Sequence, residues 1–264
     1  MNTINRYFRL IIRYTKLSIA DLGQFPFEIL MKIIALSFQV LFIWLFWTSI
    51  TNLGVSYTNW NKYEIFILTG CGTISSSVSQ LTFGFRDIEE VILTGDLDKF
   101  LMRPVNLIFS IMAEKFFIFW VIAEFIVGLA IILVAKIAGN IALHNIVPAL
   151  ILIFIGTFAL RFMYGTISIL CFWVGRISSL RDIIFSIDIA KDYPIDIFNT
   201  TMINLLTYVF PISLLATYPA KILLGKVDNV LYIIIISIML FVFWFIIFRI
   251  VLKRALLKYQ STGS

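Results

Sequence analysis

Residues 27–50 read FEILMKIIALSFQVLFIWLFWTSI, a run of apolar residues that ends in the aromatic stretch FIWLFW. A helix needs about 20 such residues to cross a hydrocarbon core of roughly 30 Å. Similar runs recur along the chain, which has 61% hydrophobic and 14% charged residues and a mean hydropathy of +0.99. Soluble globular domains are about half apolar and about one quarter charged. The sequence therefore predicts an all-α polytopic membrane protein, with a single transmembrane domain over 1–264.

We predict six transmembrane helices. The third apolar run is longer than one crossing requires, so its polar beginning near Glu114 and Lys115 is expected to protrude from the membrane. The fifth run is the shortest. The predicted spans are 27–50, 63–85, 107–137, 146–175, 177–192 and 229–252.

Basic residues give the orientation. The chain has a net charge of +6, and its basic residues gather at the ends of the apolar runs, which indicates orientation in a membrane and argues against nucleic-acid binding. With six spans, four basic segments fall on one side, so we expect both termini in the cytoplasm, a location in the cell membrane, and lipids as partners. The N-terminal segment lacks the pattern of a cleavable signal peptide. The four segments contain Arg6, Arg9, Arg13 and Lys16; Arg86, Lys99 and Arg103; Arg176 and Arg181; and Lys253, Arg254 and Lys258.

Residues 3–20 predict an amphipathic helix in the cytoplasmic interface. Its basic residues repeat at helical spacing, while apolar residues occupy other faces. This helix acts either as a general basic anchor or as a specific gating element. The basic residues are Arg6, Arg9, Arg13 and Lys16.

Three prolines interrupt residues 193–226, so an unbroken spanning helix does not fit there. Irregular backbone at membrane depth is tolerated only where it is buried in protein or lines a cavity. We therefore predict re-entrant helices on the outer side, before the last span. A fifth span at 200–223 instead of 177–192 would leave the sidedness of every other loop unchanged.

The longest polar connection on the cytoplasmic side is RDIEEVILTGDLDKFLMRPVN, residues 86–106. Alternating acidic and apolar residues at its start predict a short amphipathic helix, and Gly95 suits the end of that helix. Asp96 is placed to cap a second turn, which Pro104 would end. The loop is thus expected to present a structured, mostly acidic surface.

The motif G-x-L-D-x-x-L-x-R-P-V-N from Gly95 to Asn106, together with this topology, resembles permease subunits of type-2 (ABC-2-type) ABC exporters. The resemblance extends over the chain, including the YP…FP…YPAKILLG region from Tyr193 to Gly225. It implies that 86–106 is a coupling helix that docks on a separate nucleotide-binding ATPase subunit, and that the permease works as a dimer with a second copy or a paralogue. The implied coupling residues are Arg86, Asp87, Glu89, Glu90, Gly95, Asp96, Leu97, Asp98, Leu101, Arg103 and Pro104.

No phosphate-binding loop is present, because Gly225-Lys226 is followed by Val227 and lacks the upstream glycine. We therefore expect this chain to have no enzymatic activity and no cofactor of its own, with ATP and Mg on the partner ATPase. No catalytic constellation or metal site is recognisable. Cys71 and Cys171 lie in apolar runs and are expected to be packing residues, and His144 a loop residue.

Two ionisable residues fall inside predicted spans, where a charge costs about 2.5–3.5 kcal/mol on insertion scales. They are Glu124 and Arg161, whose estimated depths differ by about 5 Å at ~1.5 Å per residue. They form a structural ion pair, line a substrate path, or have separate partners. In the second span, the small residues of TGCGTISSSVSQ, residues 69–80, permit close helix packing or form a polar path.

The leading hypothesis is the transmembrane subunit of an ATP-driven exporter for an amphipathic substrate: a drug, a peptide or a lipid-like molecule. An alternative is an ion-coupled secondary transporter that uses Glu124 and Asp188 as proton sites, although no inverted repeat supports it. Another alternative is a membrane assembly or immunity protein that transports nothing.

Overall fold

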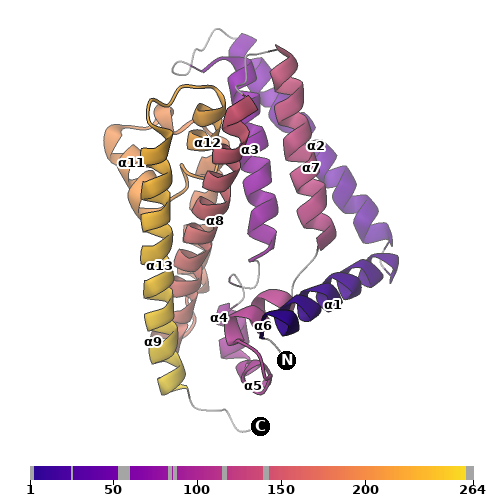
Figure 1. The fold of residues 1–264 in the computed structure, drawn as a ribbon, viewed down its shortest axis with the longest axis vertical. Helices are drawn as coiled ribbons and strands as arrows, with labels where there is room; N and C mark the ends of the chain where they lie inside the picture. The colour runs from indigo at the N-terminus through magenta and orange to yellow at the C-terminus, as the bar shows by residue number, and fades with distance from the viewer. Residues whose placement is uncertain are drawn as a thin grey trace.

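The structure is a computed structural model that describes residues 3–24, 26–52, 60–82, 85, 88–114, 118–138 and 143–259. Within these ranges all regular secondary structure is helical, which confirms the predicted all-α class. The long helices stand side by side, and short helices gather at both ends of the bundle (Figure 1).

Among the described residues, four helices contain stretches that are long and apolar enough to cross a membrane. They match the first, third, fourth and sixth predicted spans. The third run is divided into α6 (Leu107–Glu114) and α7, and Lys115 at the junction lies outside the described residues. The four helices are α2 (Pro26–Asn52), α7 (Ile118–Ala138), α8 (Ile146–Ile169) and α13 (Val230–Lys258).

The other two predicted spans differ from these four. The second is a continuous helix, α3 (Lys62–Gln80), whose serines, threonines and glycines make it less apolar. The fifth is divided into α10 (Ser178–Ser186) and a 3₁₀ helix, Ile187–Asp192. Its last turn contains Asp188, Lys191 and Asp192, which an uninterrupted apolar helix would have to place in lipid.

Helix α3 occupies the centre of the bundle, with α7 on one side and α8 on the other, while α13 packs along α8 (Figure 1). Glycines allow the close crossing of α3 and α7: a Cβ atom built at Gly70 would lie 2.9 Å from the carbonyl oxygen of Gly128. The reciprocal Cβ at Gly128 would lie 2.9 Å from the carbonyl oxygen of Gly70. Small residues in the second span therefore serve close helix packing.

Two of the three apolar clusters found among the described residues lie at different heights along the bundle. One joins α3, α7 and α8 to α12 (Thr217–Leu223), with Leu68, Ile74 and Leu152 at its centre. The other joins α8 and α13 near the opposite end, through Phe85, Phe162 and Phe248. Ring centroids of Phe85 and Phe248 are 5.2 Å apart.

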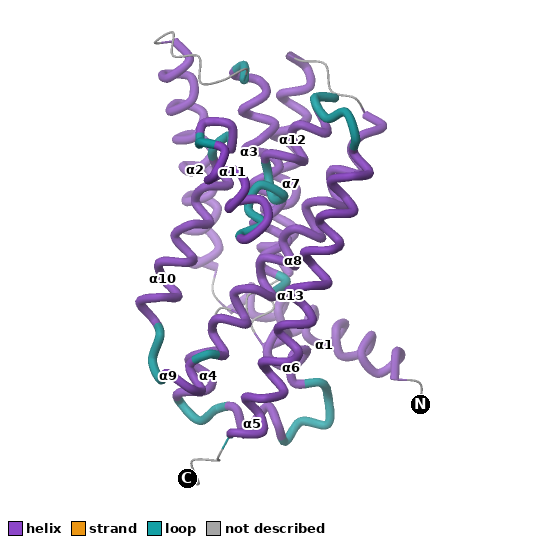
Figure 2. Tube along the Cα trace, turned by 90° about the vertical axis from the view of Figure 1, so that its left-hand side faces the viewer, coloured by secondary structure: helices purple, strands orange, loops and turns teal. Residues whose placement is uncertain are grey.

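The two ends of the bundle are built differently. Helix α1 (Thr3–Gln24), the loop helices and the C-terminal end of α13 share one end (Figures 1 and 2). Toward the other end, residues 193–226 contain only short pieces: a 3₁₀ turn, α11 (Thr200–Asn204), a π-helical turn (Leu205–Val209) and α12. No long helix forms in this stretch, as its prolines predicted.

Candidate functional site

The loop that follows α3 folds into two short helices, α4 (Ile88–Leu93) and α5 (Leu97–Leu101). Between them Gly95 has φ +80°, a conformation that favours glycine and ends the first helix as predicted. Asp96 stands at the start of α5, but its side chain makes no cap hydrogen bond to the helix. It instead accepts a hydrogen bond from Thr94 Oγ1 (3.1 Å) and lies 3.7 Å from Lys99 Nζ. These contacts give the loop a defined shape.

Glu89 ties α4 to the turn between α9 (Cys171–Val174) and α10. Its side chain is 2% exposed and accepts hydrogen bonds from the Ile177 backbone N–H (2.8 Å) and from Arg181 Nη1 (2.9 Å). A buried carboxylate needs such partners, since losing one of them would strand a charge. The sequence grouped Glu89 with the surface residues of the loop, whereas its contacts are internal.

The outer face of the loop carries apolar side chains among charged ones. Leu101 is 44% exposed and Met102 is 79% exposed, although neither belongs to a spanning stretch. Leu97 and Phe100 of the same helix are buried. Exposed apolar residues gathered outside the membrane helices indicate a protein contact. The charged residues Glu90, Asp96 and Lys99 of the same loop are also exposed.

The loop leads into α6 through a segment held by α1. Arg6 donates a hydrogen bond to the Pro104 carbonyl, and the Tyr7 hydroxyl accepts one from the Asn106 N–H (3.0 Å). The Tyr7 ring also packs edge-on against Phe109, with centroids 5.0 Å apart. Helix α1 therefore contacts the point at which the loop returns to the bundle.

Helix α1 has three faces. Tyr7, Tyr14 and Ser18 face the bundle, where the Ser18 hydroxyl accepts a hydrogen bond from the Ile118 N–H (3.0 Å). A second face exposes apolar residues, and a third carries basic ones. This arrangement suits a helix that lies in a membrane interface. The exposed apolar residues include Phe8, Ile11, Ile12 and Ile19, and the exposed basic residues are Arg9, Arg13 and Lys16.

Two further loop residues, Asp98 and Arg103, contact aromatic side chains. Asp98 lies beside Tyr259 after α13, and Arg103 lies beside Phe100 of α5. Both the partial burial of Tyr259 and the Asp98 carboxylate raise the pKa of Tyr259. The Arg103 guanidinium lies 4.8 Å from the ring centroid of Phe100. Arg86 and Asp87, which the sequence assigned to the same surface, lie outside the described residues.

The two ionisable residues singled out inside the spans do not pair with each other. Arg161 of α8 lies 3.5 Å from Asp188, and Glu124 of α7 accepts a weak hydrogen bond from Gln80 Nε2 (3.4 Å). The estimate of similar depth assumed that these spans are neighbours, but α3 stands between α7 and α8. Equal depth therefore does not bring the two side chains together.

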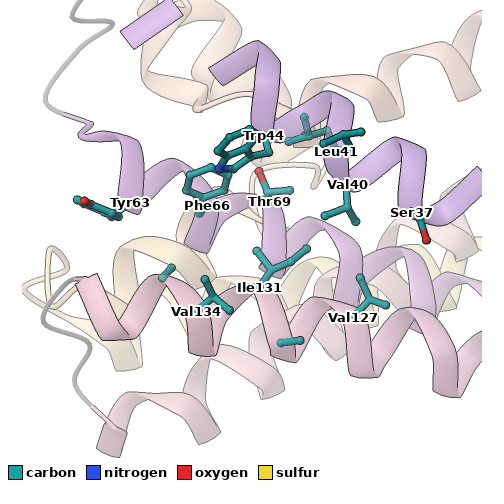
Figure 3. Close-up of a pocket in the computed structure, with 13 residues that line it drawn as sticks. Ser37, Val40, Leu41, Trp44, Tyr63, Phe66, Thr69, Val127, Ile131 and Val134 are labelled. Atoms are coloured by element: carbon teal, nitrogen blue, oxygen red, sulfur yellow. The ribbon is translucent and has the colours of Figure 1, made fainter. Parts of the chain in front are cut away.

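An apolar pocket of about 580 Å³ opens between α2, α3 and α7 (Figure 3). Helix α2 supplies Trp44, α3 supplies Phe66, and α7 supplies Ile131. Near one end, Thr69 and Ser37 are polar, but both hydroxyls donate to carbonyls of their own helices. The sequence gave no signal for this pocket, because its residues come from three separate runs and local patterns do not show which runs are neighbours.

Two contacts of the site went unrecognised in the sequence. Arg181 appeared only as a basic residue of an orientation segment, and Tyr7 gave no signal at all. Both act through long-range partners, Glu89 and Asn106, which local patterns do not link. In the part of the chain that the structure describes, no three His, Cys, Asp or Glu side chains gather as metal ligands, and Cys71 and Cys171 are free and buried.

Comparison with known protein families identifies one that matches this chain. The model of a family described as ABC-2 family transporter protein matches residues 12–263. The match therefore includes most of α1, the loop helices, all four candidate spans and the short helices before α13. A search of curated proteins finds no match.

Proposed function

Since this chain belongs to the ABC-2 family of transporter proteins, and is thus a membrane component of an ABC transporter, we propose that it is the transmembrane subunit of an ATP-driven exporter. A separate ATPase subunit binds ATP and Mg and supplies the energy. The permease works as a dimer with a second copy or a paralogue. Both termini, α1 and the loop helices lie on the cytoplasmic side.

The observation that carries this proposal is the loop with an exposed apolar tip at Leu101 and Met102. A connection between two membrane helices has no need of folded helices or of exposed apolar side chains. A docking element needs both, because a small interface derives most of its affinity from a few anchoring side chains. Glu90, Asp96 and Lys99 would surround the contact as a polar rim.

Two internal contacts would carry motion from the docked loop into the membrane. Glu89 joins α4 to Arg181 at the start of α10, and Arg6 joins the Pro104 carbonyl to α1. Movement of the loop would therefore act on α10 and α1 as well as on α3 and α6. Helix α1 would slide in the interface, with its apolar face in lipid and its basic face toward the headgroups.

The remaining assignments follow the same topology. Helix α3, together with α10 and its 3₁₀ extension, would complete six spans with the four apolar ones. Residues 193–226 would form the outer re-entrant region. The pocket between α2, α3 and α7 supports an amphipathic substrate, since it offers aromatic and aliphatic surface within the span region.

The test is co-purification with the ATPase encoded or expressed alongside this chain. Replacing Leu101 and Met102 together by alanine should leave the permease folded in the membrane and reduce ATPase association at least tenfold. Leu257→Ala is the matched control. Leu257 is 81% exposed and lies on α13, at the end of the bundle that holds the loop but outside the loop itself. Glu89→Gln should behave differently: the ATPase should still bind, and its hydrolysis should no longer drive transport.

Normal association and transport in the Leu101→Ala, Met102→Ala variant would reduce the loop to a connector and refute the proposal. Equal loss in the Leu257→Ala control would show that the effect does not belong to the loop. Loss of binding in Glu89→Gln as severe as in the tip variant would mean that Glu89 shapes the docking surface and does not transmit motion from it.

A further inference from the structure

Polar residues continue directly from the apolar pocket toward the cytoplasmic loop. On α7, Val127 lines the pocket and Glu124 lies three residues away, about 4.5 Å along the axis at ~1.5 Å per residue. On α3, Thr69 lines the pocket, and half-buried residues follow on the same face at helical spacing. They are Thr73, Ser76 and Gln80.

The 3₁₀ helix Ile187–Asp192 borders this polar strip. The Asp192 carboxylate approaches α3 so closely that a Cβ atom at Gly72 would lie 3.5 Å from its Oδ1. Lys191 Nζ lies 3.7 Å from the same oxygen. We call Gln80, Glu124, Asp188, Lys191, Asp192 and Arg161 the polar seam.

The polar seam has an excess of negative charge. Arg161 forms an ion pair with Asp188, and Lys191 forms one with Asp192. Glu124 is left with the neutral amide of Gln80 as its hydrogen-bond partner. Within the polar seam three carboxylates thus stand beside two basic groups, and Glu124, next to the pocket, has no basic hydrogen-bond partner.

Hydrogen bonding has the same imbalance. Two buried acceptors of the polar seam, Glu124 Oε2 and Asp188 Oδ1, accept no hydrogen bond. One buried donor of the seam, Arg161 Nε, makes none. A buried acceptor without a donor costs about 1–3 kcal/mol, and more when it is charged. A donor that carries a positive charge would satisfy Glu124 on both counts.

We propose that Glu124 and the polar seam bind the cationic head of an amphipathic molecule whose apolar body occupies the pocket. The site selects ammonium or other hydrophobic cations over anions of the same shape. This inference rests on the proposed function only in taking the bound molecule as the transported substrate.

A pair of isosteric hydrophobic ions tests the charge preference of the site apart from hydrogen bonding, since neither ion has a hydrogen-bond donor: tetraphenylphosphonium, a cation, and tetraphenylborate, an anion. Binding of each labelled ion to the purified chain in lipid nanodiscs is measured, with empty nanodiscs subtracted, and no ATPase is needed. Saturable binding of the cation is expected. Glu124→Gln should weaken it about tenfold, Glu124→Asp should retain most of it, and Lys191→Gln should strengthen it.

Three controls assign the effect. Asp228→Asn removes an exposed carboxylate before α13 and should change nothing. Trp44→Ala, in the pocket, should weaken both ions alike. Tetraphenylborate should respond to Glu124→Gln and Lys191→Gln in the opposite direction from the cation, or not at all.

The inference would be overturned if Glu124→Gln left the affinity for the cation unchanged, or if it changed the affinities for the cation and the anion in the same way. If Glu124→Gln fails to fold, Lys191→Gln and Asp192→Asn decide, since they must shift cation affinity in opposite directions. Charge-dependent binding in a chain that recruits no ATPase would keep the site and refute the proposed function. ATPase coupling without cation binding would do the reverse.

Discussion

Helices α2 and α3 reverse the arrangement of a water-soluble protein: the more apolar helix is exposed, and the less apolar helix is buried. The apolar helix α2 exposes Phe38, Phe42 and Trp44, and among its described side chains only Trp47 is buried. The less apolar α3 occupies the centre of the bundle, and most of its residues are buried. In lipid, apolar surface gains little from burial, so close packing and hydrogen bonds decide which helix lies inside.

The contacts of α3 are of this kind. Its backbone approaches α7 at Gly70 and Gly128, the Ser77 hydroxyl donates to the Val121 carbonyl (2.6 Å), and the hydroxyls of Ser75 and Thr157 lie 3.4 Å apart. Along the exposed face of α2, large side chains such as Phe38 and Phe42 prevent such a close approach of backbones. Small and hydroxylated residues thus mark the central helix.

The largest effect is expected where the two backbones cross. Gly70→Leu would place a side chain 2.9 Å from the Gly128 carbonyl oxygen and 2.5 Å from Ile132 Cγ1. Overpacking of this severity costs about 3 kcal/mol or more, so folded protein should be lost or its melting temperature in detergent should fall sharply. Gly72→Ala is the control, because its nearest neighbour would be at 3.5 Å. Similar melting temperatures for the two variants would refute a close crossing.

The sequence predicted much of this fold, for physical reasons. Apolar length identified the four spans, prolines identified the broken stretch 193–226, and Gly95 identified the turn between the loop helices. These are local signals, each contained in a few neighbouring residues. For the small residues of α3 the sequence allowed close packing or a polar path, and the approach of Gly70 to Gly128 shows the packing.

What the sequence could not give is which helices are neighbours. The interpretation of Glu124 and Arg161 as a pair needed α7 beside α8, and α3 separates them. The burial of Glu89 depends on Arg181 and on the Ile177 N–H, 92 and 88 positions away. Such pairs are decided by the packing of the whole bundle.

A smaller effect is expected from the interhelical hydrogen bond of Ser77. Ser77→Ala removes the donor to the Val121 carbonyl, and such bonds in membrane proteins average about 0.6 kcal/mol with a maximum of about 1.7 kcal/mol. A modest fall in melting temperature should follow. Ser76→Ala, one position away and half-buried on the polar strip, should cause less change. A larger loss for Ser76→Ala would shift the interface to the other face of α3.

The smallest effect is expected on α2. Phe42→Ala truncates a side chain that is 69% exposed, and exposed substitutions change stability by about 0.5 kcal/mol or less. In the isolated chain the ring contacts lipid, and its removal costs the folded chain few contacts with protein. The isolated chain should therefore melt at an unchanged temperature.

The same variant should then be compared in the assembled transporter. If α2 faces only lipid, Phe42→Ala is neutral in both states. If the ring lies against a second permease subunit, the assembly alone loses stability, because truncation removes packing that lipid tails do not reproduce as closely. A loss in the isolated chain as large as that of Gly70→Leu would contradict the difference between the two helices, since it would require α2 to be packed within the subunit as tightly as α3.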